Sequence, residues 1–152
     1  ITAGPWPTFF PTNATGKSRR HGAEFDLSFK LDEKLELHSS YTYVISRDAN
    51  KNIESRRPRH EFFMKARRSF QTEKQYVEIN IKNVADNYDV YPTNWSQRKM
   101  PDYTVTGLNI GWQLGGIAIY SGLSNLFDVN NSDVWGYRNP GRAAYLTAKK
   151  MW

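Results

Sequence analysis

The sequence predicts an all-β fold in which antiparallel strands cross an outer membrane as a transmembrane β-barrel. Seven segments alternate apolar and polar residues, which is the period of a strand with two different faces. Each segment has 11 to 13 residues. A tilted transmembrane strand needs about 9–11 residues, and an ordinary globular strand has about 5–6. The connections alternate strictly between short and long, as in outer-membrane barrels with short periplasmic turns and long outer loops.

The boundaries of the predicted strands follow from this pattern. The strands are 21–31, 35–46, 60–70, 74–86, 103–114, 117–127 and 141–152. The short connections are 32–34, 71–73 and 115–116, and the long ones are 47–59, 87–102 and 128–140, after a leader of residues 1–20. All seven prolines lie in the long connections or the leader. Since proline cannot donate a hydrogen bond to a neighbouring strand, their placement supports these boundaries.

Each predicted strand has one apolar face. In chain order, the first six faces are Phe25, Leu27, Phe29 and Leu31; Leu35, Leu37, Tyr41, Tyr43 and Ile45; Phe62, Met64, Ala66 and Phe70; Val77, Ile79 and Ile81; Leu108, Ile110, Trp112 and Leu114; and Ile117, Ile119 and Leu123. The third face also holds Arg68, a long side chain that can reach the headgroups from the periplasmic end. The last face holds Ala144, Leu146, Ala148 and the terminal Trp152, with Lys150 as its exception. We expect these faces to contact lipid and the opposite faces to line the barrel lumen.

Composition limits the other fold classes. A length of 152 residues indicates one domain. The mean hydropathy is −0.71 and no apolar run reaches the length of a membrane helix, so a helical membrane protein is excluded. The absence of cysteine excludes disulfides and thiolate metal sites. Aromatic residues make up 14%, which suits the aromatic girdles of a barrel. Because the chain begins at Ile1 without a signal peptide, we expect a processed chain or a piece of a longer one.

The net charge of +6 is concentrated in the leader and in loop 47–59. Two interpretations remain open for these basic residues. They are either ordinary solvated loop charges, or they meet an anion such as a lipopolysaccharide phosphate or an anionic ligand. No nucleic-acid recognition module is present, so we expect no nucleic-acid partner.

The sequence offers no candidate for catalysis. His21, His38 and His60 are not at metal-ligand spacing, and neither a nucleophile elbow nor a phosphate loop is present. The run DVNNSD (128–133) lacks the glycine and glutamate of an EF-hand loop and predicts an ordinary turn. We therefore expect no enzyme activity, no catalytic or metal-binding residue and no cofactor.

Aromatic and basic residues gather in the long loops. Ligand sites combine aromatic walls with a few polar groups, so these loops are the candidate binding surface. The candidate ligand-binding residues are Arg56, Arg57, Tyr91, Trp95, Arg98, Trp135, Tyr137 and Arg138. We rank Trp95 and Tyr137 first, because each lies mid-loop near a basic residue.

Residues 121–142, SGLSNLFDVNNSDVWGYRNPGR, closely resemble the penultimate strand, last outer loop and final strand of TonB-dependent outer-membrane receptors. The resemblance rests on Asn-Leu-Phe-Asp at 125–128, Gly-Tyr at 136–137 and Gly-Arg at 141–142. Upstream, GAEFDLSFKL (22–31), LELHSSYTYVISRD (35–48) and RRPRHEFF (56–63) are similar to preceding strands of the same family. The resemblance covers about residues 16–152.

This resemblance implies a barrel of about 22 strands closed around a plug, of which residues 1–152 supply the C-terminal seven or so, with the plug domain absent. It implies a receptor of the bacterial outer membrane that imports a scarce nutrient, a ferric siderophore (iron–siderophore complex) or cobalamin, with energy from a TonB-type coupling protein. The implied partners are the remaining strands and plug, the coupling protein, outer-membrane lipid and lipopolysaccharide, and the ligand. A smaller porin or adhesin barrel and a soluble all-β binding module are the alternatives.

Overall fold

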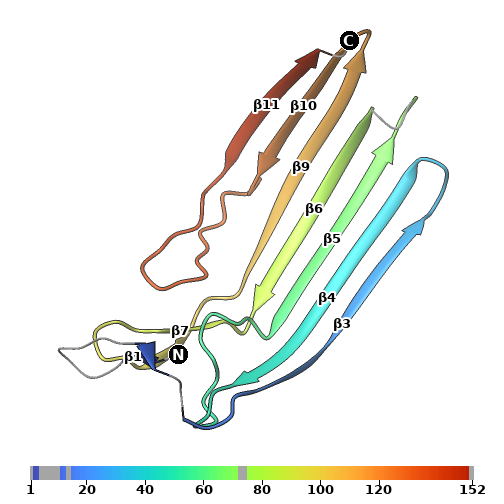
Figure 1. Cartoon of the computed structure of the whole chain (residues 1–152). Helices are drawn as coiled ribbons and strands as arrows, with labels where there is room; N and C mark the ends of the chain where they lie inside the picture. The colour runs from blue at the N-terminus through green and yellow to red at the C-terminus, as the bar shows by residue number, and fades with distance from the viewer. Residues whose placement is uncertain (1, 4–10, 13–14, 72–74, 151–152) are drawn as a thin grey trace.

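The computed structural model describes residues 2–3, 11–12, 15–71 and 75–150. Its main feature is one antiparallel sheet of seven long strands (Figure 1). These are β3 (Arg19–Lys30), β4 (Leu35–Arg47), β5 (His60–Ser69), β6 (Tyr76–Ala85), β9 (Tyr103–Leu114), β10 (Ile117–Ser124) and β11 (Ala143–Lys150). They lie in the order in which they occur along the chain, from β3 at one edge to β11 at the other. All seven predicted strands are therefore confirmed as elements of one sheet.

In the described part of the chain, no helix is long and apolar enough to span a membrane.

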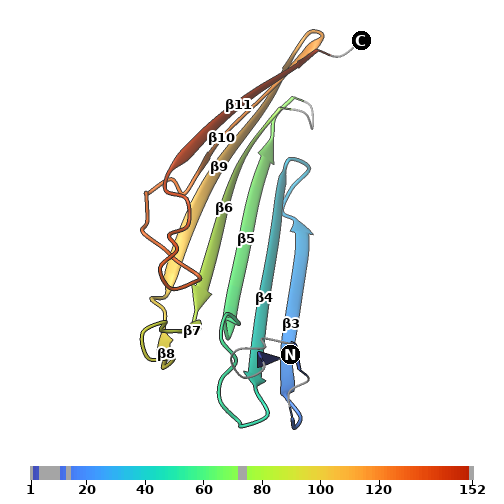
Figure 2. The ribbon, with the colours of Figure 1, turned by 60° about the vertical axis from the view of Figure 1, so that its left-hand side comes forward.

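The connections divide between the two ends of the sheet, as predicted. The three long loops gather at one end, and the turns at 32–34 and 115–116 lie at the other, where β11 also ends (Figure 1). The third turn, 71–73, lies mostly outside the described residues. The sheet is strongly curved and is open, with β3 and β11 as its edges (Figure 2).

The register places apolar residues next to one another across the whole sheet. One continuous row of paired positions runs through Phe29, Leu37, Ala66, Ile79, Leu108, Leu123 and Ala144. The adjacent row, on the opposite face, runs through Lys30, Glu36, Arg67, Glu78, Asn109, Gly122 and Tyr145. A slip of one residue in any strand would exchange these faces, so the hydrophobic pattern specifies the register.

The apolar face is uncovered. Leu27 is 59% exposed and Leu146 is 74% exposed, although both lie on this face. Among the side chains that the structure describes, few apolar ones are buried, and Val84 and Ala118 of these lie on the polar face. A water-soluble sheet protein would cover such a face with a second layer. This face therefore needs an apolar environment, as the barrel prediction requires.

Some predicted boundaries are wrong. β10 ends at Ser124 rather than at residue 127, because Asn125 adopts a φ of 48° and leaves the strand. β11 begins at Ala143 rather than at 141, and β3 begins at Arg19, two residues before the predicted start. The predicted aromatic end of the last strand, Trp152, lies outside the described residues.

Two small elements were not predicted. Loop 87–102 contains a hairpin of β7 (Tyr88–Val90) and β8 (Gln97–Lys99). In the leader, β1 (Thr2–Ala3) pairs with β2 (Pro11–Thr12). The hairpin holds three of the candidate ligand-binding residues: Arg98 in β8, and Tyr91 and Trp95 in the connection between its strands.

Candidate functional site

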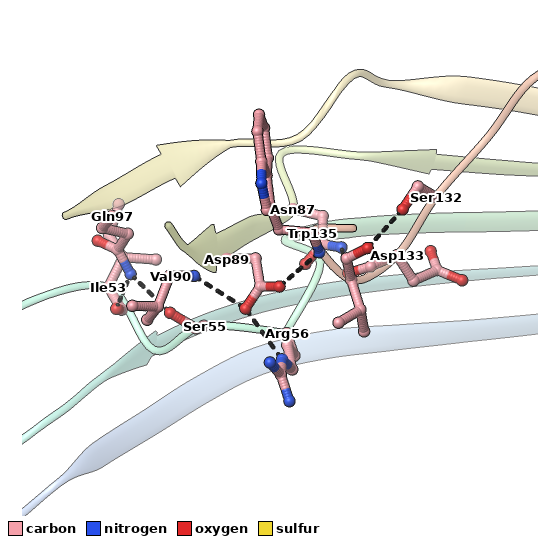
Figure 3. Close-up of polar contacts among 11 residues, drawn as sticks. Ile53, Ser55, Arg56, Asn87, Asp89, Val90, Gln97, Ser132, Asp133 and Trp135 are labelled. Atoms are coloured by element: carbon pink, nitrogen blue, oxygen red, sulfur yellow. Dashed lines mark hydrogen bonds and ion pairs between the residues drawn. The ribbon is translucent and has the colours of Figure 1, made fainter. Parts of the chain in front are cut away.

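The three long loops meet at the buried carboxylate of Asp89 in β7 (Figure 3). Its Oδ1 accepts hydrogen bonds from Arg56 Nε at 2.9 Å and from its neighbour Val90 N at 2.8 Å. Its Oδ2 accepts one from Trp135 N at 2.7 Å. Since Arg56 belongs to loop 47–59 and Trp135 to loop 128–140, this one side chain joins all three loops.

The charge of Asp89 is stabilised in place. Burial raises the pKa of the Asp89 carboxyl, but the hydrogen bonds from Trp135 N, Arg56 and Val90 N outweigh burial and leave this pKa below its usual value. The carboxylate is therefore ionised at neutral pH. A buried charge with three donors holds its neighbours more firmly than a neutral group would.

A second junction lies beside the first, at Asp133. Its carboxylate accepts hydrogen bonds from Tyr103 Oη at 2.7 Å and Asn139 Nδ2 at 2.9 Å. Its backbone carbonyl accepts one from Asn87 Nδ2 at 3.0 Å. These contacts tie loop 128–140 to the start of β9 and to loop 87–102. The DVNNSD run was predicted to be an ordinary turn, but residues 128–133 contain no turn and Asp133 connects the loop to neighbouring segments.

Arg98 of β8 lies against two of the candidate aromatic residues. Its guanidinium carbon is 4.1 Å from the centroid of the Tyr91 ring and 5.9 Å from that of the Trp135 ring. The two rings meet edge to face, with centroids 5.0 Å apart. No carboxylate among the described residues forms an ion pair with Arg98, and its side chain is exposed. The hairpin therefore presents an exposed cation supported by two aromatic rings.

Trp95 and Arg57 share a second feature, a surface depression of about 660 Å³. Trp95 is 81% exposed and adopts a φ of 56° in the tip of the hairpin. Arg57 forms an ion pair with Glu54 at 3.0 Å, and Arg20 of β3 contacts the same carboxylate at 2.8 Å. The hydrogen bonds from Arg20 and Ser46 lower the pKa of Glu54 to about 2. Gln97 Nε2 donates to Ile53 O and so joins the hairpin to this loop.

The structure thus separates the eight candidate ligand-binding residues into groups. Tyr91, Arg98 and Trp135 lie together, and Trp95 and Arg57 line one depression. Arg56 is held by Asp89. Tyr137 and Arg138 are exposed beyond both groups, in loop 128–140.

The sequence reasoning missed the acidic residues that organise the loops. Asp89, Asp133 and Glu54 each accept hydrogen bonds from more than one segment. The available signal was an acidic residue in a long loop that neighbours a strongly basic loop. Nothing local in the sequence shows which of the loop carboxylates is buried.

The Asn-Leu-Phe-Asp element forms the turn that leaves β10. The side chain of Asn125 accepts from Val129 N at 2.9 Å and donates to Val129 O at 2.9 Å. Asp128 Oδ1 accepts from Arg142 N at 2.8 Å, across the base of the loop. A Cβ at Gly141 would lie 2.7 Å from that same oxygen, so only glycine leaves the contact undisturbed. The paired motifs therefore close the last loop at its base.

No group of three or more His, Cys, Asp or Glu side chains that could hold a metal ion is found in the described ranges.

Comparison with known proteins agrees with this architecture. Residues 1–131 match the family model described as TonB dependent receptor-like, beta-barrel. The ferripyoverdine receptor of the outer membrane of Pseudomonas aeruginosa is similar, with a TM-score of 0.73 and 18% identity over 86% of this chain and 19% of that chain. None of the curated proteins compared with this chain matches it.

Two further solved structures are similar. The siderophore receptor PirA from Acinetobacter baumannii gives a TM-score of 0.64 and 20% identity over 84% of this chain and 21% of that chain. The copper transporter OprC gives 0.67 and 16% identity over 86% and 23%. This chain thus spans about a fifth of the length of these proteins. At these sequence identities the structural similarity shows the fold alone. Membership of the family is shown by the match of residues 1–131 to the family model. The fold and the family are those of transport receptors rather than enzymes. The chain belongs to the TonB-dependent receptor β-barrel family of the bacterial outer membrane.

Proposed function

We propose that residues 1–152 are the C-terminal wall of a larger barrel of about 22 strands that encloses a plug. The open sheet supports this proposal. β3 and β11 each lack a second partner in the described structure, and an unpaired strand edge is not tolerated in a bilayer. The remaining strands of the same receptor would pair with these edges, and the polar row from Lys30 to Asn109 would face the plug.

We propose that the receptor imports a scarce nutrient that is captured at the outer loops, with energy from a TonB-type coupling protein. The observation that carries this proposal is the contact of Arg98 with Tyr91 and Trp135, fixed in place by Asp89. Such a surface favours an anionic ligand with planar groups, because the cation attracts charge and the rings offer faces for stacking. A ferric siderophore fits this description.

Cobalamin is the alternative ligand. It is bulky and nearly neutral, so it would depend on aromatic contact and hydrogen bonds. The exposed rings of Trp95 and Tyr137 favour this possibility, since neither ring lies beneath a cation. The structural neighbours include siderophore receptors and a copper transporter, and these neighbours do not decide which ligand this chain binds.

The test uses the full-length receptor and measures binding of a ferric siderophore and of cobalamin at low and high salt. We expect Arg98→Ala to weaken siderophore binding about 10-fold or more, as for the loss of a hydrogen bond to a charged ligand group worth about 1.5–3 kcal/mol. Added salt should reduce the wild-type affinity and have less effect on the variant. The control is Arg68→Ala, which removes the same charge from the opposite end of the sheet, where Arg68 pairs with Asp32.

Two results would argue against the proposal. If Arg98→Ala and Arg57→Ala leave siderophore affinity unchanged while Trp95→Ala weakens cobalamin binding, the ligand is cobalamin. If all these variants and Trp135→Ala bind both ligands as the wild type does, these loops are not the capture surface.

A further inference from the structure

A basic cluster lies at the outer end of β3 and β4, apart from the loop junctions. It consists of Lys17, Arg19, Arg47 and Lys51, all exposed, which together with His21, Asp48 and Ala49 line a hollow of about 520 Å³. In the register of the two strands, Arg19 is the direct partner of Arg47. Like charges placed directly opposite each other destabilise a strand pair. The fold therefore brings these two cations together at a cost.

No carboxylate in the described part of the chain compensates for this charge. None of the ion pairs of the structure includes Lys17, Arg19, Arg47 or Lys51. Asp48 lines the same hollow, but its carboxylate accepts hydrogen bonds from Asn50 N, Asn52 N and Asn52 Nδ2 within its own loop. Arg47 Nη1 donates to the carbonyl of Lys51, which fixes the guanidinium without neutralising it.

The cluster lies on the lipid-facing side of the sheet. Side chains alternate along β3, so Arg19 shares its face with Phe25, Leu27 and Phe29. On β4, Arg47 likewise shares its face with Tyr41 and Tyr43. By contrast, Arg20 points to the other face, where Glu54 neutralises it. Arg19 and Arg47, which have no carboxylate partner among the described residues, are therefore on the membrane side, and Arg20, which is paired, is on the lumen side.

The position along the strand matches the headgroup layer. Tyr41 and Tyr43 lie on this face toward the outer end of β4, and tyrosine is enriched at membrane interfaces. Arg47 lies four residues beyond Tyr43, which is about 13 Å along a strand. For a strand tilted by about 45°, this distance is roughly 9 Å along the membrane normal. The headgroup region adds about 5–8 Å outside the hydrocarbon core. The cluster thus lies near the level of lipid phosphates in the outer leaflet.

We propose that Lys17, Arg19, Arg47 and Lys51 form a binding site for the phosphate groups of lipopolysaccharide on the outer wall of the barrel. The lipid phosphates supply the counter-charge that the Arg19–Arg47 pair lacks, and the acyl chains lie on the apolar face below. Binding involves charge-assisted hydrogen bonds and no covalent step. The site is distinct from the nutrient-capture surface: Arg19 and Arg47 lie on the opposite face from Arg20, and of the lining residues only Asp48 is shared with the Trp95 depression.

The test reconstitutes the full-length receptor into phospholipid bilayers and titrates it with lipopolysaccharide. The Arg19→Gln/Arg47→Gln variant should bind at least 10-fold more weakly than the wild type, and Arg19→Lys/Arg47→Lys should retain most of the binding because it keeps the charge. The matched control, Arg57→Gln/Arg98→Gln, removes two loop cations elsewhere and should bind as the wild type does. Each variant is compared only after its folded fraction is shown by circular dichroism.

Two further probes identify the ligand chemistry. Lipopolysaccharide whose lipid A has been dephosphorylated should bind at least 10-fold more weakly than the intact form, and this difference should vanish in Arg19→Gln/Arg47→Gln. Inorganic phosphate at millimolar concentration should not displace the lipid. The proposal is overturned if Arg19→Gln/Arg47→Gln binds like the wild type, if the control loses as much affinity, or if dephosphorylated lipid binds equally well. Displacement by inorganic phosphate would also overturn it, because the site would then take a free anion.

Discussion

Replacing Asp89 by asparagine should release loop 128–140 from the hairpin. Three donors now meet two carboxylate oxygens: Arg56 and Val90 N at Oδ1, and Trp135 N at Oδ2. Asparagine has one acceptor oxygen, so its amide nitrogen must face one of these donors. The less costly orientation keeps Oδ1 and leaves the amide of Trp135 without an acceptor.

The magnitude follows from these contacts. A fully buried donor left without a partner costs about 1–3 kcal/mol, and the part-buried amide of Trp135 falls in the lower part of this range. Losing the charge on the contact with Arg56, which is largely exposed, adds at most about 1 kcal/mol. A local loss of about 1–3 kcal/mol corresponds to roughly 5–150-fold faster opening at Trp135.

The assay is hydrogen exchange of the Trp135 amide in the full-length receptor, read by mass spectrometry of peptides from loop 128–140. The control is Asp48→Asn, whose carboxylate also accepts backbone N–H groups but only within loop 47–59. Its effect should stay within that loop. A change of less than about threefold at Trp135 in Asp89→Asn would refute the claim that this carboxylate joins the loops.

Ile79→Arg, on the lipid face, should reduce the free energy of unfolding by about 2–4 kcal/mol, and its neighbour Asn80→Arg, on the lumen face, by much less; equal losses in denaturant titrations would contradict the assigned faces. Gly141→Ala should weaken the contact between Asp128 and Arg142 N by about 1 kcal/mol and speed exchange at Arg142, with Asn130→Ala as a silent control. The folded pKa values of Asp89 and Glu54 are both depressed, so their stabilisation is complete above the ordinary carboxyl pKa and is lost only as pH falls below about 4. Exchange corrected for its intrinsic pH dependence should then be constant between about pH 5 and 8, and loosening of the loops near pH 6 would contradict this.

The strands were predictable because a strand between lipid and a wet lumen must alternate apolar and polar side chains. This alternation alone assigned Ile79 and Asn80 to opposite faces. The strand boundaries were less predictable where a side chain hydrogen-bonds to the local backbone and ends the pairing with the neighbouring strand. At Asn125 the amide bonds to the backbone of Val129 and ends β10 early, although Leu126 and Phe127 continue the apolar pattern.

The candidate site was predictable only in its composition. Loop length and the aromatic and basic content pointed to residues such as Arg98 and Trp135, but their contact depends on the β7–β8 hairpin, which the sequence pattern did not reveal. Asp89 was missed because its role arises from donors 33 and 46 residues away along the chain. Such long-range contacts leave no local periodicity to detect.

We expect these strands to cross the outer membrane with the three long loops outside and the short turns in the periplasm. The chain contains no cysteine, so a single introduced cysteine reports its own position. Asn130→Cys, in an exposed part of the last long loop, and Glu33→Cys, in an exposed short turn, would each be placed in the full-length receptor. Intact cells would then be treated with a maleimide attached to a polymer too large to cross the outer membrane. With this orientation, Asn130→Cys is labelled in intact cells and Glu33→Cys is labelled only after the outer membrane is opened. Labelling of Glu33→Cys in intact cells, or protection of Asn130→Cys, would contradict it.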